Sequence, residues 1–341
     1  MKKIFSQSVL VLLTAMTIFV SSCKKDNVSN TVTNFGDIVQ SLGFANSKGY
    51  VVVNNSELVK IVNLDKQGVY ISNEGAYQHD NGTVSIIDTV KKSIINNASF
   101  NEVAELKISY PRYFLEIDAT RAYITSGKYR GSVKIVNLQA NTITDSIVVG
   151  NGPNQLIKSG NYVYVANNGG WTSDSTVSVI DFTANKLVKS IVVGNDPNEL
   201  VADVNGDIWV ICSDNKANSK IVQISHNTLT VEKYFVEGYA NPNRYESKLI
   251  SISSDKNTIY FQDSLSVYAY PINSTLLTLN TFIKTTTELY GLNVDPSNGD
   301  IFCIESGDYS SGGTISIYNK NGTFKKSYIA GIGTSGAYFN Y

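Results

Sequence analysis

The chain is poor in the residues that commonly carry metal and acid–base chemistry. Its 341 residues include 2 histidines, 3 cysteines, 2 tryptophans and 2 methionines, with a formal net charge of -1. A balanced charge argues against the broad basic surface that nucleic-acid binding usually requires. His79 and His226 lie far apart in the sequence and lack the spacing of metal ligands. We therefore expect no catalytic residues, no metal and no cofactor, and predict that the protein is not an enzyme.

What the chain has in excess are residues of strands and tight turns. It contains 25 glycines, 36 asparagines and 21 tyrosines, and 42% of its residues are hydrophobic. This hydrophobic content excludes a disordered chain. Many β-branched and aromatic residues between Asn- and Gly-rich turns predict an all-β fold.

The N-terminal residues have the pattern of an export signal. Two lysines precede an apolar run at residues 9–20, which is too short for a membrane-spanning helix. The following Val20-Ser21-Ser22-Cys23 resembles a bacterial lipobox. We expect a lipoprotein signal peptide over residues 1–22 and lipidation at Cys23; the alternative is an ordinary signal peptide with a chance cysteine.

The residues after Cys23 are polar and predict a lipidated flexible tether over 23–36. Lys24 stands where an aspartate is linked with retention at the inner membrane, so the resemblance implies an outer-membrane lipid anchor, which we expect at the cell surface. The remaining cysteines, Cys212 and Cys303, lie in apolar runs of repeat units that are not neighbours. They are expected to be buried free thiols, although export permits a disulfide.

One strand–loop–strand unit recurs seven times. Its first strands are predicted at residues 50–54, 69–73, 122–126, 162–167, 208–213, 258–263 and 301–305, and its second strands centre on Val59, Val84, Val133, Val177, Ile221, Val267 and Ile315. After a first step of 25 residues, successive centres lie 44 to 49 residues apart. Four-stranded propeller blades repeat at about 40–45 residues. The sequence therefore predicts a single seven-bladed β-propeller with four-stranded antiparallel blades over residues 37–341.

A second marker supports the blade boundaries. Gly150-Asn151-Gly152-Pro153-Asn154 recurs 44 residues later as Gly194-Asn195-Asp196-Pro197-Asn198, each before a predicted inner strand. The short first step suggests that the first two units are interleaved. Strands in residues 38–63 are expected to form one blade completed by 103–108. Residues 69–97 are expected to form its neighbour, closed by the C-terminal segment 331–339.

The repeated Gly-x-x-Pro-Asn, Tyr-Val-Tyr-Val-Ala-Asn-Asn and Thr-Val-Ser-Val-Ile-Asp segments resemble YncE-like seven-bladed propellers. Residues 68–75 and 81–85 resemble the opening blade of Bacteroides-type surface lipoproteins of that class, with the order of the first two units reversed. The resemblance extends to BtuG-like proteins, which capture corrinoids for a TonB-dependent transporter. It implies a corrinoid (vitamin B12) or other small-molecule ligand, such a transporter as partner, and no nucleic acid.

Several loops expected at one end of the ring carry aromatic, amide or cationic side chains. Rigid aromatic faces with amide donors suit a large, planar, amide-decorated ligand. The candidate ligand-binding residues are Tyr77, His79, Arg112, Tyr129, Arg130, Asn168, Trp171, Tyr245 and Tyr309.

Two other functional classes stay open. A ring of loops can present a protein- or glycan-binding surface without catalysis, because fold does not fix function. A quinoprotein-like enzyme subunit is a more distant alternative, and distant carboxylates that a sequence alone cannot pair leave a hydrolase open. The segment 203–207, Asp-Val-Asn-Gly-Asp, superficially resembles a calcium loop, but its glycine is one place early and a hairpin turn is expected instead.

Overall fold

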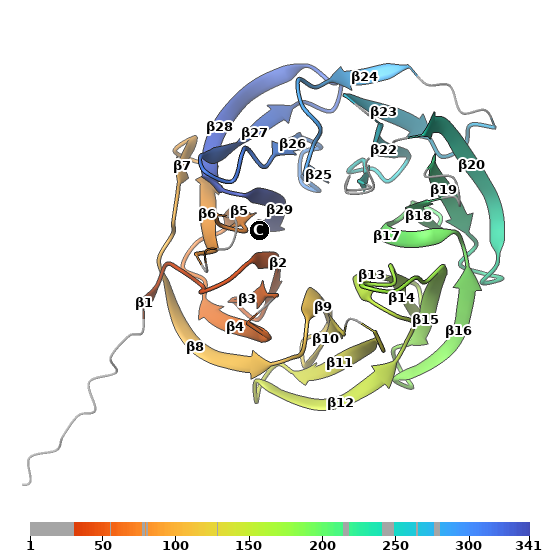
Figure 1. Ribbon diagram of the computed structural model, residues 1–341, viewed down its shortest axis with the longest axis horizontal. Helices are drawn as coiled ribbons and strands as arrows, with labels where there is room; N and C mark the ends of the chain where they lie inside the picture. The colour runs from red at the N-terminus through yellow and green to blue at the C-terminus, as the bar shows by residue number, and fades with distance from the viewer. Residues whose placement is uncertain are drawn as a thin grey trace, which may run out of the picture.

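The chain folds into seven antiparallel sheets arranged around a central axis, as the repeat predicts (Figure 1). The computed structural model describes residues 31–54, 56–76, 79, 81–127, 129–213, 218–240, 249–263, 265–275 and 280–341. All regular elements in these ranges are strands, which confirms the seven-bladed all-β propeller. The described ranges contain no helix of the length and apolarity that a membrane span needs.

Five blades follow the chain without interruption, each running outward from the axis. Their strands are β9 (Pro111–Asp118), β10 (Arg121–Ser126), β11 (Ser132–Asn137) and β12 (Thr142–Val148); β13 (Pro153–Ser159), β14 (Tyr162–Asn167), β15 (Thr176–Asp181) and β16 (Lys186–Val192); β17 (Asn195–Ala202), β18 (Ile208–Ser213), β19 (Asn218–Ile224) and β20 (Val231–Ala240); β21 (Ile250–Ile252), β22 (Thr258–Asp263), β23 (Ser266–Pro271) and β24 (Thr281–Lys284); and β25 (Gly291–Val294), β26 (Ile301–Glu305), β27 (Gly312–Tyr318) and β28 (Phe324–Ile332).

The other two blades are built from interleaved segments. One orders its strands β2 (Val39–Ala45), β3 (Lys48–Val53), β4 (Leu58–Asn63), β8 (Phe100–Lys107) and β1 (Thr31–Val32). The other orders β29 (Thr334–Asn340), β5 (Gly68–Asn73), β6 (Thr83–Asp88) and β7 (Ser93–Ile95). β4 pairs with β8, and the C-terminal β29 pairs with β5 from Thr334 opposite Asn73 to Asn340 opposite Gly68. The interleaving hypothesis is therefore confirmed.

The paired part of the chain begins before residue 37, where the sequence placed the end of the tether. Thr31 and Val32 pair with Asn101 and Phe100 of β8. Phe35 is 1% exposed and lies in the same hydrophobic cluster as Phe100. A short edge strand and one buried aromatic thus extend the fold into residues 31–36, a segment too polar overall for the sequence to reveal this.

Burial within a blade follows strand position. In β14, a central strand, Val163 to Asn167 are all buried, whereas β12 and β16 at the rim expose every residue but one. Central strands are covered on both faces by neighbouring blades and therefore carry continuous apolar runs. The rim strands are edges, and the lysines of β16 are typical of edges that avoid pairing with other chains.

Hydrophobic clusters fill the spaces between blades. Tyr50 of β3 stacks on Phe114 of β9 with ring centroids 4.3 Å apart. Gly43 makes this contact possible, because a Cβ there would lie 2.0 Å from the Phe114 ring. Cys212 and Cys303 are both buried and free, which confirms the prediction that they pack as small apolar residues.

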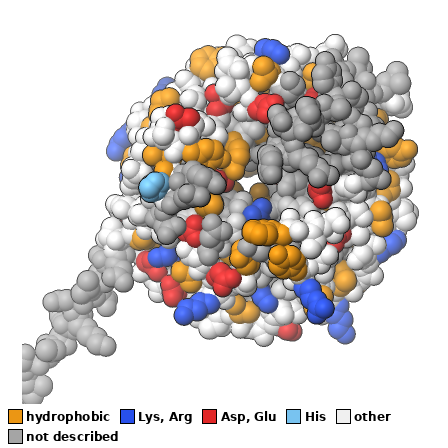
Figure 2. All heavy atoms as spheres, viewed as in Figure 1, with side chains coloured by type: hydrophobic (Ala, Val, Ile, Leu, Met, Phe, Trp, Pro, Cys, Tyr) orange, Lys and Arg blue, Asp and Glu red, His pale blue; other side chains and the backbone are white. Residues whose placement is uncertain are grey.

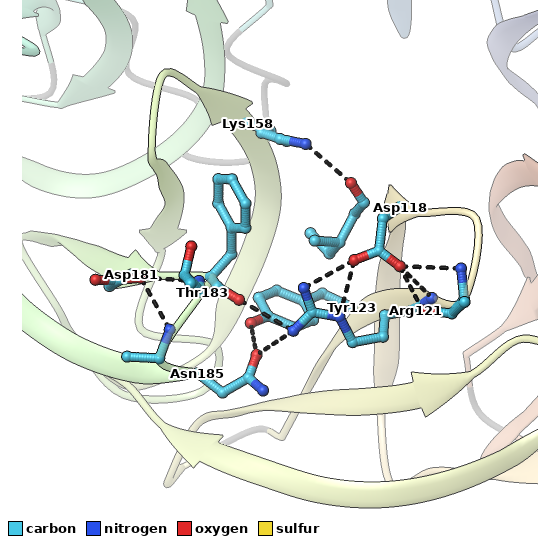
Figure 3. A network of polar contacts seen from close by, with 11 residues as sticks. Asp118, Arg121, Tyr123, Lys158, Asp181, Thr183 and Asn185 are labelled. Carbon is cyan, nitrogen blue, oxygen red and sulfur yellow. Dashed lines mark hydrogen bonds and ion pairs between the residues drawn. The ribbon is translucent and has the colours of Figure 1, made fainter.

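We call the two ends of the ring the turn face and the loop face. The turn face carries the hairpin turns, such as those between β9 and β10 and between β15 and β16. There Arg121 contacts Asp118 at 2.8 Å and reaches across to the neighbouring blade, donating to the Phe182 carbonyl at 3.1 Å (Figure 3). The Tyr123 hydroxyl and Arg121 both donate to Asn185 Oδ1. These hydrogen bonds connect adjacent blades.

The segment 203–207 is a hairpin turn, as expected. The Asp203 amide donates to the Asp207 carbonyl at 2.9 Å, and Asp203 Oδ2 accepts a bond from the indole nitrogen of buried Trp209 at 2.9 Å. Asp207 accepts bonds from the amide and the ring Nδ1 of His226. Both carboxylates and His226 therefore serve the structure of this turn.

Candidate functional site

The loop face carries the other set of connections: the loops β5–β6, β10–β11, β14–β15 and β26–β27, together with the links from one blade to the next. The two kinds of loop contact each other. The amides of Asn168 and Gly169 donate to the carbonyls of Gly152 and Asn151, both at 3.0 Å. The Gly-x-x-Pro links therefore share a face with the strand-to-strand loops. A Cβ on Gly152 would lie 2.1 Å from the amide nitrogen of Gly170, so the contact requires glycine.

Two of the predicted aromatic residues are prominently exposed on this face. Trp171 is 73% exposed and Tyr129 is 55% exposed. Figure 2 shows hydrophobic side chains gathered over the β9–β12 and β13–β16 blades, beside a central hollow. Asn168 Oδ1 accepts the Gly170 amide at 2.9 Å and so holds the loop that carries Trp171. The aromatic surface is therefore presented by a hydrogen-bonded loop, which lowers the entropy lost on binding.

Arg112 lies at the axis rather than on the rim. It is the second residue of β9, and its Nε donates to Asn154 Oδ1 at 3.1 Å. Asn154 in turn donates to Asn198 Oδ1 at 2.7 Å, and the Arg112 carbonyl accepts from the Ser41 hydroxyl at 2.6 Å. A belt of hydrogen bonds thus joins the inner strands of four successive blades, β2, β9, β13 and β17.

Below this belt lies a group of ionisable side chains that we call the channel cluster. Its members are Glu74, Arg112, Tyr113, Glu199, Tyr290 and Tyr338, each partly exposed. Burial first, and then the charge of Glu199, raise the pKa of Tyr338. Burial, with Tyr338 and Glu199, also raises the pKa of Tyr113. Because β9, β17 and β29 belong to blades that are not neighbours, these groups can act on one another only across the axis (Figure 1).

Glu199 joins the inner strands of two blades. Its Oε2 accepts the Ile250 amide of β21 at 2.9 Å. Burial raises the pKa of the Glu199 carboxyl group to about 8, although the hydrogen bond from Ile250 opposes the shift. Near neutral pH Glu199 is therefore mainly protonated and can donate a hydrogen bond.

Glu74 follows β5 and faces the same centre. Burial raises the pKa of Glu74 to about 7, against the opposing effects of Tyr290 and Arg112. The Tyr290 hydroxyl donates to both Glu74 oxygens, at 3.2 and 3.3 Å. Tyr309 stands edge-on to Tyr290 with ring centroids 6.4 Å apart, so this predicted residue borders the cluster. Its φ of +58° is uncommon for an aromatic residue and marks a tightly constrained loop.

The other predicted residues are spread over the loop face or lie outside the described ranges. His79 and Arg130 are exposed on the β5–β6 and β10–β11 loops. Tyr77, Tyr245 and Cys23 lie outside the described residues. The structure therefore brings Arg112 and Tyr309 to the channel cluster, and leaves Trp171, Tyr129 and Asn168 on other loops of the same face.

Sequence reasoning missed five members of the channel cluster. Tyr113, Glu199 and Tyr338 lie in inner strands, whose side chains facing the axis cannot be told from core side chains by sequence pattern alone; Glu74 and Tyr290 lie just outside strands. One signal was available: the Pro-Asn marker is followed by Gln155 in one blade and by Glu199 in the next. An acid in an otherwise apolar strand is rare unless it is paired or functional.

The described residues contain no group of three or more His, Cys, Asp or Glu side chains able to hold a metal ion. They do contain a second concavity, a pocket of about 420 Å³ beside the ring closure. It is lined by Thr33, Asn34, Gly75, Asn81, Asn97 and Ile332 among others, and carries no charged side chain. The channel cluster is thus the concentration of ionisable groups at the centre of the ring, whereas this pocket is uncharged.

Comparison with known proteins identifies a family and a fold. The profile of the family described as "Domain of unknown function (DUF5074)" matches residues 92–339. No curated protein matches the chain. Among solved structures, hydrazine synthase of Kuenenia stuttgartiensis is similar with a TM-score of 0.58, 13% identity, and coverage of 88% of this chain and 89% of that one. A functionally unknown protein of Desulfotomaculum acetoxidans is similar with a TM-score of 0.57, 13% identity and 89% coverage of both chains. At such identities the likeness shows the fold alone.

Proposed function

Because this chain belongs to the DUF5074 family, whose description names no activity, we propose from the loop face itself that the protein captures a ligand there without catalysis. The observation that carries this proposal is that one face of the ring holds both a partly exposed ionisable cluster on its inner strands and strongly exposed aromatic side chains on its loops. A ligand lying across both buries apolar area on Trp171 and Tyr129 and is oriented by polar groups at the centre.

The ligand that best suits this arrangement is large and rather flat, with an apolar body and many amide groups. A corrinoid such as vitamin B12 has these properties, and the resemblance to YncE-like and BtuG-like propellers leads to the same ligand. We propose that Trp171 and Tyr129 lie against the body of the ligand, while Arg112 and Asn168 bind its side-chain amides.

The N-terminal sequence extends this proposal to a location. Lipidation at Cys23 would anchor the propeller to the outer membrane, where a captured corrinoid could pass to a TonB-dependent transporter. Mass spectrometry of the protein purified from membranes tests the anchor: a diacylated or triacylated N-terminal Cys23 is expected, and an unmodified N-terminus elsewhere would contradict it.

Binding can be measured by titrating cyanocobalamin into the propeller by calorimetry, followed in parallel by tryptophan fluorescence. The two tryptophans give an internal contrast, because Trp171 is 73% exposed and Trp209 is fully buried. Trp171→Ala should weaken binding about 10-fold or more, since aromatic side chains at the centre of interfaces commonly contribute 2 kcal/mol or more.

The matched control is Phe324→Ala, which removes an aromatic side chain that is 54% exposed on the rim strand β28. Its affinity should equal that of the wild type. Absence of binding at micromolar cyanocobalamin would remove the corrinoid proposal. A glycan or protein that binds in a Trp171-dependent way would then identify the alternative ligand class for the same face.

A further inference from the structure

In two neighbouring blades, different side chains accept the equivalent hydrogen bond from a backbone amide of the next blade. Gln155 and Glu199 each stand two residues after the proline of a Gly-x-x-Pro link. Gln155 Oε1 accepts the amide of Leu200, and Glu199 Oε2 accepts the amide of Ile250 in the equivalent place. Accepting this backbone hydrogen bond needs only one oxygen, which a glutamine supplies. A carboxyl group at position 199 is therefore not explained by this hydrogen bond. Burying an acid is costly unless its second oxygen is also used.

Three hydrogen-bonding groups at this level have no partner among the described residues. They are Glu199 Oε1, the Tyr113 hydroxyl and the two terminal nitrogens of Arg112, whose Nε is held by Asn154. All three residues are partly exposed in the channel. Their open donors and acceptors are therefore accessible to solvent and are available to a bound molecule.

The surrounding elements determine which kind of group fits. β9 supplies Arg112 and Tyr113, β29 supplies Tyr338, and the segments after β5 and before β25 supply Glu74 and Tyr290. β21 carries no titratable side chain, and Lys158 of β13 reaches the turn face, where it donates to the Ile117 carbonyl. Asp196, at the start of β17, is exposed.

The cluster therefore offers the Tyr113 hydroxyl, the Arg112 guanidinium and the Glu199 carboxyl group to the channel. We propose that the channel cluster holds one acceptor oxygen of the ligand, an amide carbonyl or a carboxylate, between Tyr113, Arg112 and the carboxyl group of Glu199. This inference uses the site of the proposed function but does not depend on the ligand being a corrinoid. Burial, which raises the pKa of Glu199 to about 8, agrees with it.

A donor that must carry a proton makes binding depend on pH. Above about pH 8 the wild-type protein has to take up a proton to bind, and its affinity should fall by about tenfold per pH unit. Glu199→Gln keeps an oxygen for the Ile250 amide, as Gln155 does for Leu200, and its amide N–H still donates to the ligand. This variant should therefore lose much less affinity than the wild type between about pH 6 and about pH 9. The dependence that remains is that of Glu74, whose pKa burial raises to about 7 and which both proteins share.

Calorimetry with cyanocobalamin, in two buffers of different ionisation enthalpy, measures both quantities. Tyr113→Phe should weaken binding about 10-fold at every pH without changing the proton uptake, because it removes one donor that does not titrate in this range. Glu116→Gln is the matched control, an exposed glutamate on β9 outside the cluster, and should behave as the wild type. A Glu199→Gln variant that loses affinity at high pH as steeply as the wild type would overturn the proposal.

A second measurement separates this proposal from the choice of ligand. Infrared difference spectra of wild type minus Glu199→Gln, without ligand, should show the carbonyl band of a protonated carboxyl near neutral pH. Propionamide and propionate, the simplest amide and carboxylate acceptors, should shift that band, and the stronger shift tells which acceptor is preferred. If cyanocobalamin fails to bind but the band is present and shifts, the corrinoid assignment fails and the acceptor site stands; an absent or unresponsive band overturns the acceptor site.

Discussion

The two ends of the ring use carboxylates in opposite ways. On the turn face, hydrogen bonds from Thr120 and Arg121 outweigh burial and lower the pKa of Asp118 to about 2. On the loop face, burial raises the pKa of Glu74 to about 7 and that of Glu199 to about 8. Ionised carboxylates thus stabilise the hairpin turns, whereas at the channel ionisation opposes the fold.

This difference separates structural polar groups from functional ones. The turn-face carboxylates of Asp118, Asp181, Asp203 and Asp295 each accept two or more bonds from the turn that follows them. The channel cluster instead leaves donors and acceptors unpaired within the described residues. Carboxyl groups that have shifted pKa values and unused hydrogen-bonding atoms are characteristic of sites that bind another molecule.

The largest effect should come from removing a buried turn-face carboxylate. Asp203→Ala leaves the indole N–H of Trp209 and two backbone amides without their acceptor, at a site only 3% exposed. Unpaired buried donors cost about 1–3 kcal/mol each, so we expect a loss of about 2–4 kcal/mol in urea unfolding. Ligand binding should not change.

The control for this variant is Asp255→Ala in the exposed hairpin between β21 and β22. Asp255 caps its turn through Ser253 and Asn257 at the surface, where water can replace it. A loss below about 1 kcal/mol is expected there. Equal losses for the two variants would contradict the buried role of Asp203.

An intermediate effect should appear in the pH dependence of stability. The folded pKa of Glu199 lies above its unfolded value of 4.5, so the unfolded chain binds fewer protons between these two pKa values and stability falls as pH rises through them. Glu199→Gln should match the wild type at about pH 4 and exceed it by about 1–3 kcal/mol at about pH 9, after allowance for contact with solvent in the channel. Thermal unfolding over this range, with Glu116→Gln as reference, measures the difference.

The smallest effect is expected at Asp118. Its pKa is depressed to about 2, so its contribution is present above the unfolded value of 3.8 and is lost as pH falls through about 2. The side chain is 41% exposed, and solvent screening limits the contribution to below about 1 kcal/mol. Asp118→Asn should lower the melting temperature slightly at neutral pH, with the gap closing in acid; a gap that widens in acid would reverse the assigned role of the ion pair.

Much of the fold follows from local pattern. The first strands of the repeat, predicted for example at 162–167, 208–213 and 301–305, have these bounds in the structure. Central strands require β-branched and aromatic runs, and turns require Asn, Asp and Gly, so each signal lies within a few residues of the element that it specifies. Even the interleaved blades were predictable, because the chain between β4 and β5 is too short to hold an outer strand.

The site was only partly predictable. The sequence pointed to Trp171 and Tyr129 because the exposure of large aromatic side chains in loops is not explained by the fold. It pointed to Arg112 because this residue follows a link between two blades. Glu74 and Tyr290, separated by 216 residues, form a hydrogen bond that no local pattern encodes. Inner strands look like core in sequence, since period-two alternation does not tell whether a side chain faces a neighbouring blade or the axis.

By itself, the sequence determined the all-β class, seven repeats and the loop face, because hydrogen bonding and burial within a blade are local in the chain. Only the tertiary structure decided that Arg112, Tyr113, Glu199 and Tyr338 line the same channel and act on one another. Closing the ring through β29 and β5 converts strands that are distant in sequence into neighbours across an axis. The low dielectric of that enclosed centre, which no single strand possesses, then raises the pKa values on which the proposed binding depends.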